Sequence, residues 1–134
     1  MMSVLAIDHG LARAGVAISD PSETIASPVG VVEPPEAEAV AKIAREREAD
    51  LIVVGLPVSL DGGERDQARM AREFVEQLSG LVEVEVETWD ERLTTRMADA
   101  SRRSGAGAAP AALAAAHLLE SFLQSRELAR GETR

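Results

Sequence analysis

Short apolar runs open the chain and predict three consecutive strands. Residues 3–8 and 15–19 are two such runs with a glycine-containing turn between them, which is typical of a β-hairpin. Residues 27–32 are expected to form a third strand, although Pro28 and Gly30 interrupt its pattern. Strands joined by short turns pair in antiparallel fashion, so this part of the chain should form an antiparallel meander.

Two later segments have the patterns of further strands. Residues 51–54 are continuously apolar, as expected of a strand buried on both faces of a sheet. A loop rich in glycine and proline, residues 55–63, follows this strand. Valine and glutamate alternate over residues 82–87, which predicts a strand with valine facing inward and glutamate outward. A row of glutamates would also discourage another chain from pairing at a sheet edge.

The remaining segments have the spacing of amphipathic helices. We expect helices over residues 34–49, 64–78 and 94–104, and a final helix that begins at Pro110. The tail, from about residue 125 to 134, is expected to be frayed. The predicted core face of the final helix consists of Ala112, Ala115, Ala116, Leu119, Phe122 and Leu123.

These elements together predict an α/β fold in a single domain of residues 1–134. The first three strands are antiparallel, and strands reached through crossover helices add in parallel, so the sheet should be mixed and five-stranded. In such sheets ligands bind outside the carboxyl ends of the strands. Asp8, the loop of residues 55–63 and Asp90 are all expected at that edge.

Composition narrows the chemistry open to a site at this edge. The 134 residues include no cysteine, which excludes disulfides and thiolate zinc sites. They include two histidines, His9 and His117, so a metal site would be built from oxygen ligands. Oxygen ligands suit Mg²⁺ or Mn²⁺ better than Zn²⁺. His9 is expected to be an exposed turn residue, and His117 a structural one.

Charge bears on the choice of partner. The net charge of −9 weighs against nucleic acid, but arginines recur over residues 65–72 and 92–103. These arginines either bind phosphate or pair with neighbouring carboxylates on solvated helix faces. One tryptophan and no tyrosine leave little scope for base stacking. The apolar runs are far shorter than the roughly 20 residues that span a bilayer, and no signal-peptide pattern opens the chain, so we expect a cytoplasmic location.

Two of the predicted strands lead into carboxylates. Asp8 ends the first strand, and Asp90 and Glu91 follow the Val/Glu segment. If both strands belong to one sheet, Asp8 and Asp90 emerge at strand ends and could share a site. Carboxylates repel one another, so a divalent cation is the usual reason for such a pair. Metal-assisted hydrolysis of phosphodiester bonds is therefore the leading hypothesis.

Three motifs stand at a characteristic spacing. They are Leu-Ala-Ile-Asp-His-Gly at 5–10 with Arg-Ala-Gly-Val-Ala at 13–17, Ile-Val-Val-Gly-Leu-Pro at 52–57 with Leu-Asp-Gly at 60–62, and Asp-Glu-Arg-Leu-Thr-Thr at 90–95. In these motifs the chain resembles the YqgF/RuvX family of Holliday junction resolvases and pre-ribosomal-RNA nucleases, within the ribonuclease-H-like superfamily. The first motif also opens many sugar kinases and actin-like ATPases, but those nucleotide-binding proteins need two such lobes and much longer chains.

The resemblance implies a ribonuclease-H-like fold and a nuclease that uses Mg²⁺ or Mn²⁺. Its substrate would be ribosomal RNA precursor, for maturation of the pre-16S rRNA 5′ end, or branched DNA, for resolution of a Holliday junction. Asp8 and Asp90 would hold metal, and Glu91 would join them as a catalytic residue. A homodimer is compatible with junction chemistry, because a four-way junction has two equivalent strands to cut.

The candidate nucleic-acid contacts surround these carboxylates, and each has an alternative role. Gly55, Pro57 and Gly62 either let the backbone approach a ligand closely or simply shape a turn. The arginine either touches phosphate or neutralises the carboxylates, and the threonines either contact phosphate or cap the next helix. The residues concerned are Gly55, Pro57, Asp61, Gly62, Arg92, Thr94 and Thr95.

One position departs from the family pattern. Family members usually carry an aspartate at the start of the last helix, and this chain has Ala111 there. The preceding loop, residues 105–109, is made of glycine and alanine where the family tends to have lysine and arginine. The alternative hypothesis is therefore a nucleic-acid-binding module of the same fold with weak or lost catalysis.

Overall fold

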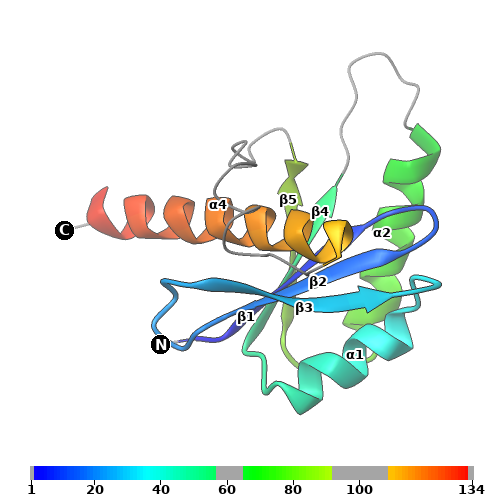
Figure 1. Cartoon of the computed structure of the whole chain (residues 1–134), viewed down its shortest axis with the longest axis horizontal. Coiled ribbons are helices and arrows are strands. Elements are labelled where there is room, and N and C mark those ends of the chain that lie inside the picture. Colours follow the sequence, from blue (N-terminus) through cyan, green and yellow to red (C-terminus); the bar gives the residue numbers. More distant parts are fainter. Residues whose placement is uncertain (1, 57–64, 92–108, 133–134) are drawn as a thin grey trace.

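The computed structural model describes residues 2–56, 65–91 and 109–132, which form one five-stranded sheet with helices on both faces (Figure 1). None of the described helices is both long and apolar enough to cross a membrane. The elements are β1 (Val4–His9), β2 (Ala14–Ser19), β3 (Ala26–Val32), α1 (Ala37–Glu46), β4 (Leu51–Leu56), α2 (Arg65–Ser79), β5 (Glu85–Asp90) and α4 (Pro110–Glu132).

The sheet has the mixed topology that the sequence predicts. Its strand order is β3-β2-β1-β4-β5, and β2 pairs in antiparallel fashion with both β1 and β3. Strand β4 pairs in parallel with β1, and β5 pairs in parallel with β4. The C-terminal ends of β1, β4 and β5 therefore meet at one edge of the sheet, which we call the carboxyl edge.

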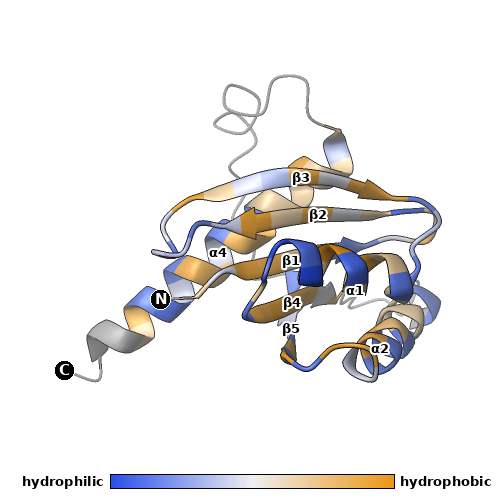
Figure 2. Cartoon of the chain, turned by 90° about the horizontal axis from the view of Figure 1, so that it is seen from below, coloured by the Kyte–Doolittle hydropathy of each residue, from blue (hydrophilic) through white to orange (hydrophobic). Residues whose placement is uncertain are grey.

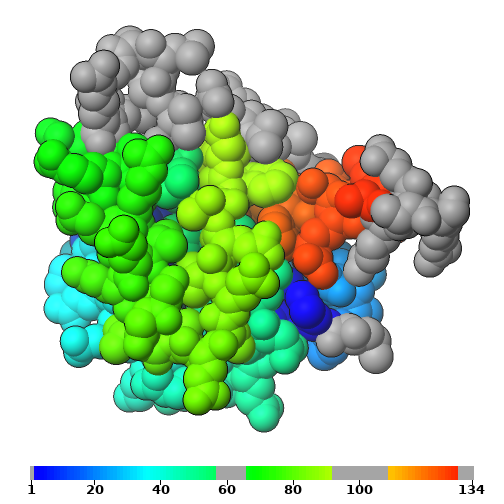
Figure 3. All heavy atoms as spheres, turned by 180° about the vertical axis from the view of Figure 1, so that it is seen from behind, coloured from blue at the N-terminus to red at the C-terminus, as the bar shows by residue number. Residues whose placement is uncertain are grey.

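The sheet divides the core into two layers, each covered by helices. Alternate residues of each strand point to opposite faces, so β1 sends Leu5 and Ile7 toward α1 and α2, and Val4 and Ala6 toward α4. Strands β1 and β4 are buried on both faces and largely apolar (Figure 2), apart from Asp8 and His9 at the end of β1. Strand β5 lies at the sheet edge, beside α2 on the surface of the molecule (Figure 3).

Several boundaries differ from the prediction. Strand β4 continues through Gly55 and Leu56, which were expected in a loop, because parallel pairing with β5 extends that far. Strand β5 covers 85–90 rather than 82–87, although Val82 and Val84 still pack against the core. The loop expected to continue over residues 57–63 and the helix expected over 94–104 lie outside the described residues.

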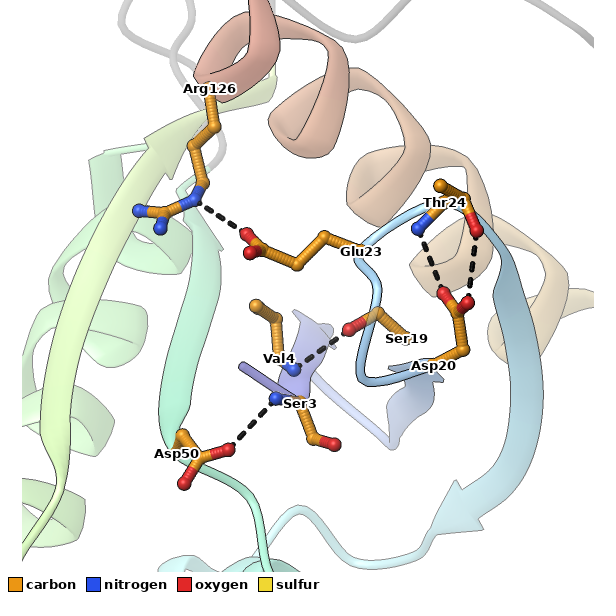
Figure 4. Close-up of polar contacts among 8 residues, drawn as sticks. All are labelled: Ser3, Val4, Ser19, Asp20, Glu23, Thr24, Asp50 and Arg126. Carbon is orange, nitrogen blue, oxygen red and sulfur yellow. Dashed lines mark hydrogen bonds and ion pairs between the residues drawn. The ribbon is translucent and has the colours of Figure 1, made fainter. Parts of the chain in front are cut away.

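The prediction of a frayed C-terminal tail is wrong as far as Glu132, because α4 continues to that residue. A contact with the β2–β3 turn holds this part of the helix (Figure 4). The Arg126 guanidinium donates to the Glu23 carboxylate with an Nε–Oε1 distance of 3.0 Å, and the Glu23 side chain is 6% exposed. The same guanidinium lies over the Phe122 ring.

Asp20 organises the turn that carries Glu23. Its carboxylate accepts hydrogen bonds from the backbone N–H, at 2.8 Å, and the hydroxyl of Thr24 (Figure 4). It also accepts hydrogen bonds from the backbone N–H of Ile25, at 2.8 Å, and from the hydroxyl of Ser22. These bonds, led by that from Ser22, hold the pKa of Asp20 well below its usual range. Above the pKa of an unfolded aspartate, Asp20 is ionised in both the folded and the unfolded protein, and in that pH range its hydrogen bonds stabilise the folded state fully.

We predict that this turn contributes to acid unfolding. The stabilisation should be complete above about pH 5 and should fall as the pH drops toward the lowered pKa of folded Asp20. Asp20→Asn should therefore lower the melting temperature at pH 7 and flatten its decline below about pH 5. Melting curves of both proteins between pH 2 and 8 test this, and parallel curves would contradict it.

The packing of α4 depends on a missing side chain in β2. Gly15 lies under the start of α4, where a methyl group would be 1.8 Å from the carbonyl oxygen of Ala111 and 2.9 Å from the nitrogen of Ala112. Both contacts are with backbone, so rotation of a side chain cannot relieve them. Helix α4 can reach this position only because residue 15 has no Cβ.

Gly15→Ala should therefore destabilise the protein. Displacing the first turn of α4 should cost about 2–3 kcal/mol of unfolding free energy, as overpacked cores do. Gly30→Ala is the matched control, because a methyl group on this β3 glycine meets nothing within 4 Å. Urea unfolding measures both, and equal stabilities of the two variants would show that α4 does not depend on Gly15.

Candidate functional site

Asp8 lies between two glycines at the carboxyl edge. It is the residue before the end of β1, and its Cα partners are Gly15 on β2 and Gly55 on β4. Gly55 is paired in turn with Trp89 on β5, so these four residues form one row across the sheet. Since Ala6 faces α4, Asp8 two residues later faces α4 as well. The row leaves the carboxylate of Asp8 without a side chain on either flanking residue.

The carboxylate of Glu91 occupies the space above one of these glycines. A methyl group on Gly55 would lie 3.1 Å from Oε1 of Glu91 and 2.3 Å from Cδ1 of Leu118 on α4. Glu91 follows the last residue of β5 and is partly buried. Its side chain therefore lies on the α4 face, over the residue that pairs with Asp8.

Asp90 emerges at the same edge but on the other face. It pairs with Leu56 and lies on the same face of β5 as Val86, four residues earlier, which packs in the layer of α1 and α2. The expectation that Asp8 and Asp90 both end strands at one edge is thus confirmed, while their side chains leave opposite faces. The structure brings Glu91, rather than Asp90, to the face of Asp8.

His9 is a buried residue, and the prediction of an exposed turn histidine is wrong. Strand β1 includes His9, so strand alternation directs its ring into the α2 layer, where it is 4% exposed and its centroid lies 4.8 Å from that of Phe74. Burial lowers the pKa of His9, and the charge of neighbouring Asp8 opposes this only in part. Among the described residues Nδ1 of His9 has no hydrogen-bond partner.

The position of the missing family aspartate lies beside Asp8. Ala111 is in the first turn of α4, and its carbonyl group lies against Gly15, the partner of Asp8 in β2. The backbone of residue 111 therefore lies against the β2 partner of Asp8. With alanine there, the described part of the site has two carboxylates on the α4 face.

Trp89 secures the strand end that carries Glu91. Its ring meets that of Phe122 on α4 edge to face, with centroids 5.6 Å apart. Aromatic pairs of this kind contribute about 0.5–1.5 kcal/mol beyond their buried area. The tryptophan thus packs within the protein, in keeping with the expectation that base stacking is not the main binding mode.

The donor set suits a hard cation. In the described ranges, no group of three or more histidine, aspartate or glutamate side chains is arranged to hold a metal ion. Asp8 and Glu91 are instead two carboxylates on one face of the sheet, since Glu91 lies over Gly55, the β4 partner of Asp8. Mg²⁺ commonly binds through one or two carboxylates and keeps several waters, so the residues fit such an ion.

The predicted nucleic-acid contacts fall only in part on described residues. Gly55 is described and lies under Glu91, consistent with a close approach at that position. Its sequence context predicts only a residue that admits a ligand or shapes a turn. The pattern of apolar residues does not predict that Gly55 makes room for the side chains of Glu91 and Leu118. Pro57, Asp61, Gly62, Arg92, Thr94 and Thr95 lie outside the described residues.

Comparisons with known proteins agree on one family. A family model described as Holliday junction resolvase, RuvX, matches residues 2–125. A protein of Endomicrobium trichonymphae named "Putative pre-16S rRNA nuclease" is 39% identical over 103 residues, 74% of each chain. A relative of the same name from Chloroflexus aurantiacus is 38% identical over 135 residues, covering 92% of this chain and 87% of the relative.

A solved structure with a similar fold is T. thermophilus RuvC in complex with a Holliday junction substrate. Its TM-score is 0.73, and the match covers 95% of this chain and 96% of that one. At 14% sequence identity this likeness shows the fold alone.

Proposed function

The chain belongs to the RuvX family, and from this premise and the geometry of the carboxyl edge we propose that it is a metal-dependent nuclease. The observation that carries the proposal is the placement of Asp8 and Glu91 on one face, above glycines. Two carboxylates on one face at the ends of parallel strands are suited to phosphodiester hydrolysis with a divalent cation.

Asp8 and Glu91 would supply the oxygen ligands of Mg²⁺ or Mn²⁺. When bound, such an ion activates water and stabilises the charge that develops on phosphate oxygens. The absence of side chains at Gly15 and Gly55 lets α4 and Glu91 pack beside Asp8, and the Trp89–Phe122 contact fixes the strand end that carries Glu91. Asp90 would act from the opposite face, by positioning this strand end rather than by sharing the cation with Asp8.

The substrate is a nucleic acid, and two classes fit the relatives. The named relatives support ribosomal RNA precursor, and the family description supports a four-way DNA junction. A twofold homodimer would suit the junction, because two equivalent sites would meet two equivalent strands. For either substrate we expect the protein to act in the cytoplasm.

Ala111 favours a second candidate function. With alanine next to Gly15, the site lacks the third carboxylate that the family pattern places there. Fewer carboxylates should weaken binding of a second cation. The chain would then bind nucleic acid through the same fold with little or no cleavage.

A cleavage assay with matched variants separates these functions. Labelled single-stranded RNA, single-stranded DNA and a four-way junction are incubated with protein and either Mg²⁺ or Mn²⁺. Asp8→Asn and Glu91→Gln should each lower the rate at least about 100-fold, because each removes a ligand charge. Asp90→Asn should cost less than Glu91→Gln. Glu85→Gln, at the far end of β5 on the α4 face, should be neutral.

The remaining outcomes are equally informative. Activity in the unmodified protein that Glu91→Gln leaves intact would contradict the assignment of Glu91. An inactive protein that gains cleavage in Ala111→Asp would establish the binding module instead. Cleavage of one substrate over the others would identify the natural one.

A further inference from the structure

Arg13 lies on the same face of the sheet as Asp8. The β1–β2 turn closes through a hydrogen bond from the N–H of Gly10 to the carbonyl of Arg13, at 2.9 Å, and places Arg13 immediately before β2. Residue 14 faces the α1 and α2 layer, and Gly15 faces α4. By strand alternation Arg13 faces α4, two residues beyond Gly15 toward the carboxyl edge.

An ion pair holds the Arg13 side chain from one side. Its Nε donates to Oε2 of Glu33, at 2.9 Å, from the residue that follows β3. The side chains are 53% and 59% exposed, so this pair adds little to stability. Its effect is one of orientation. Guanidinium has five N–H donors, and within the described residues the Arg13 side chain makes no other hydrogen bond, so both terminal nitrogens stay available.

Binding of a phosphate at this acidic face requires a positively charged side chain nearby. Asp8 and Glu91 make its α4 face acidic, and the five strands carry no lysine or arginine. The glycine- and alanine-rich residues 105–109 offer no charge from the segment before α4. Arg13 is the described cation that stands nearest to Asp8 in the sheet register, and a forked guanidinium matches the geometry of phosphate oxygens.

We propose that Arg13, oriented by Glu33, binds a backbone phosphate of the nucleic-acid strand, next to the phosphate that is cut. The proposal rests on the proposed function, since it takes the occupant of the carboxyl edge to be a nucleic acid. Contact with the backbone positions a strand without reading its sequence. Arg13 therefore sets the affinity and register of the strand over Asp8, and Glu33 keeps the guanidinium side-on.

Binding and cleavage are measured separately to test this. Binding of a labelled single-stranded RNA is followed by fluorescence anisotropy in EDTA, where no cleavage occurs, over a range of KCl concentrations. Each phosphate contact on a single strand contributes about 0.7 to the slope of log K against log salt. Arg13→Ala should reduce that slope by about 0.7, and Arg13→Lys, which keeps the charge, should retain it.

Two controls isolate the contact from its surroundings. Glu33→Gln removes the ion pair but keeps an acceptor for Nε, so the slope should not change. Arg45→Ala removes an exposed cation from the last turn of α1 and should leave the slope unaltered. In the cleavage assay Arg13→Ala should raise KM about tenfold and leave kcat within a few-fold.

An unchanged slope in Arg13→Ala, or an equal change in Arg45→Ala, would overturn the inference. Failure of the unmodified protein to bind any nucleic acid would overturn both this inference and the proposed function. Binding that depends on Arg13 without cleavage in any metal would reject the nuclease alone. These outcomes keep the two proposals distinguishable.

Discussion

The close approach of α4 to the sheet is the constraint on which the rest of the structure depends. It is possible because both residues that flank Asp8 in the sheet, Gly15 and Gly55, have no side chain. The backbone of α4 takes up the first space, and Leu118 and Glu91 take up the second. The same two absences therefore dock the helix and admit Glu91 beside Asp8, so folding and the site share one requirement.

Strand alternation decides which carboxylates can act together. Asp90 and Glu91 are neighbours in sequence, yet they lie on opposite faces of the sheet because a strand turns each successive side chain over. Asp8 and Glu91 share the α4 face with Arg13, whereas Asp90 lies on the side of buried His9. One face of the carboxyl edge thus combines two carboxylates with a guanidinium, a charge pattern that suits the proposed binding of a divalent cation and a phosphate.

Much of the fold could be predicted because apolar periodicity reports burial directly. The hairpin, the doubly buried β4 and the core face of α4 all follow from it. The shift of β5 to 85–90 could not be predicted, because a period of two fits either register and only pairing with β4 selects one. The burial of His9 was mispredicted for a related reason: the exact strand end fixes the face of each side chain, and sequence patterns leave strand ends uncertain.

The central claim is that Asp8 and Glu91 hold a cation on the α4 face of the carboxyl edge. Anomalous diffraction from crystals grown with Mn²⁺ tests it most directly, because the ion is located independently of activity. We predict an anomalous peak within about 2.0–2.3 Å of carboxylate oxygens from Asp8 and Glu91, with the remaining ligands water. A peak bound by Asp90 on the opposite face, or ordered Asp8 and Glu91 carboxylates without a peak at saturating Mn²⁺, would contradict the account.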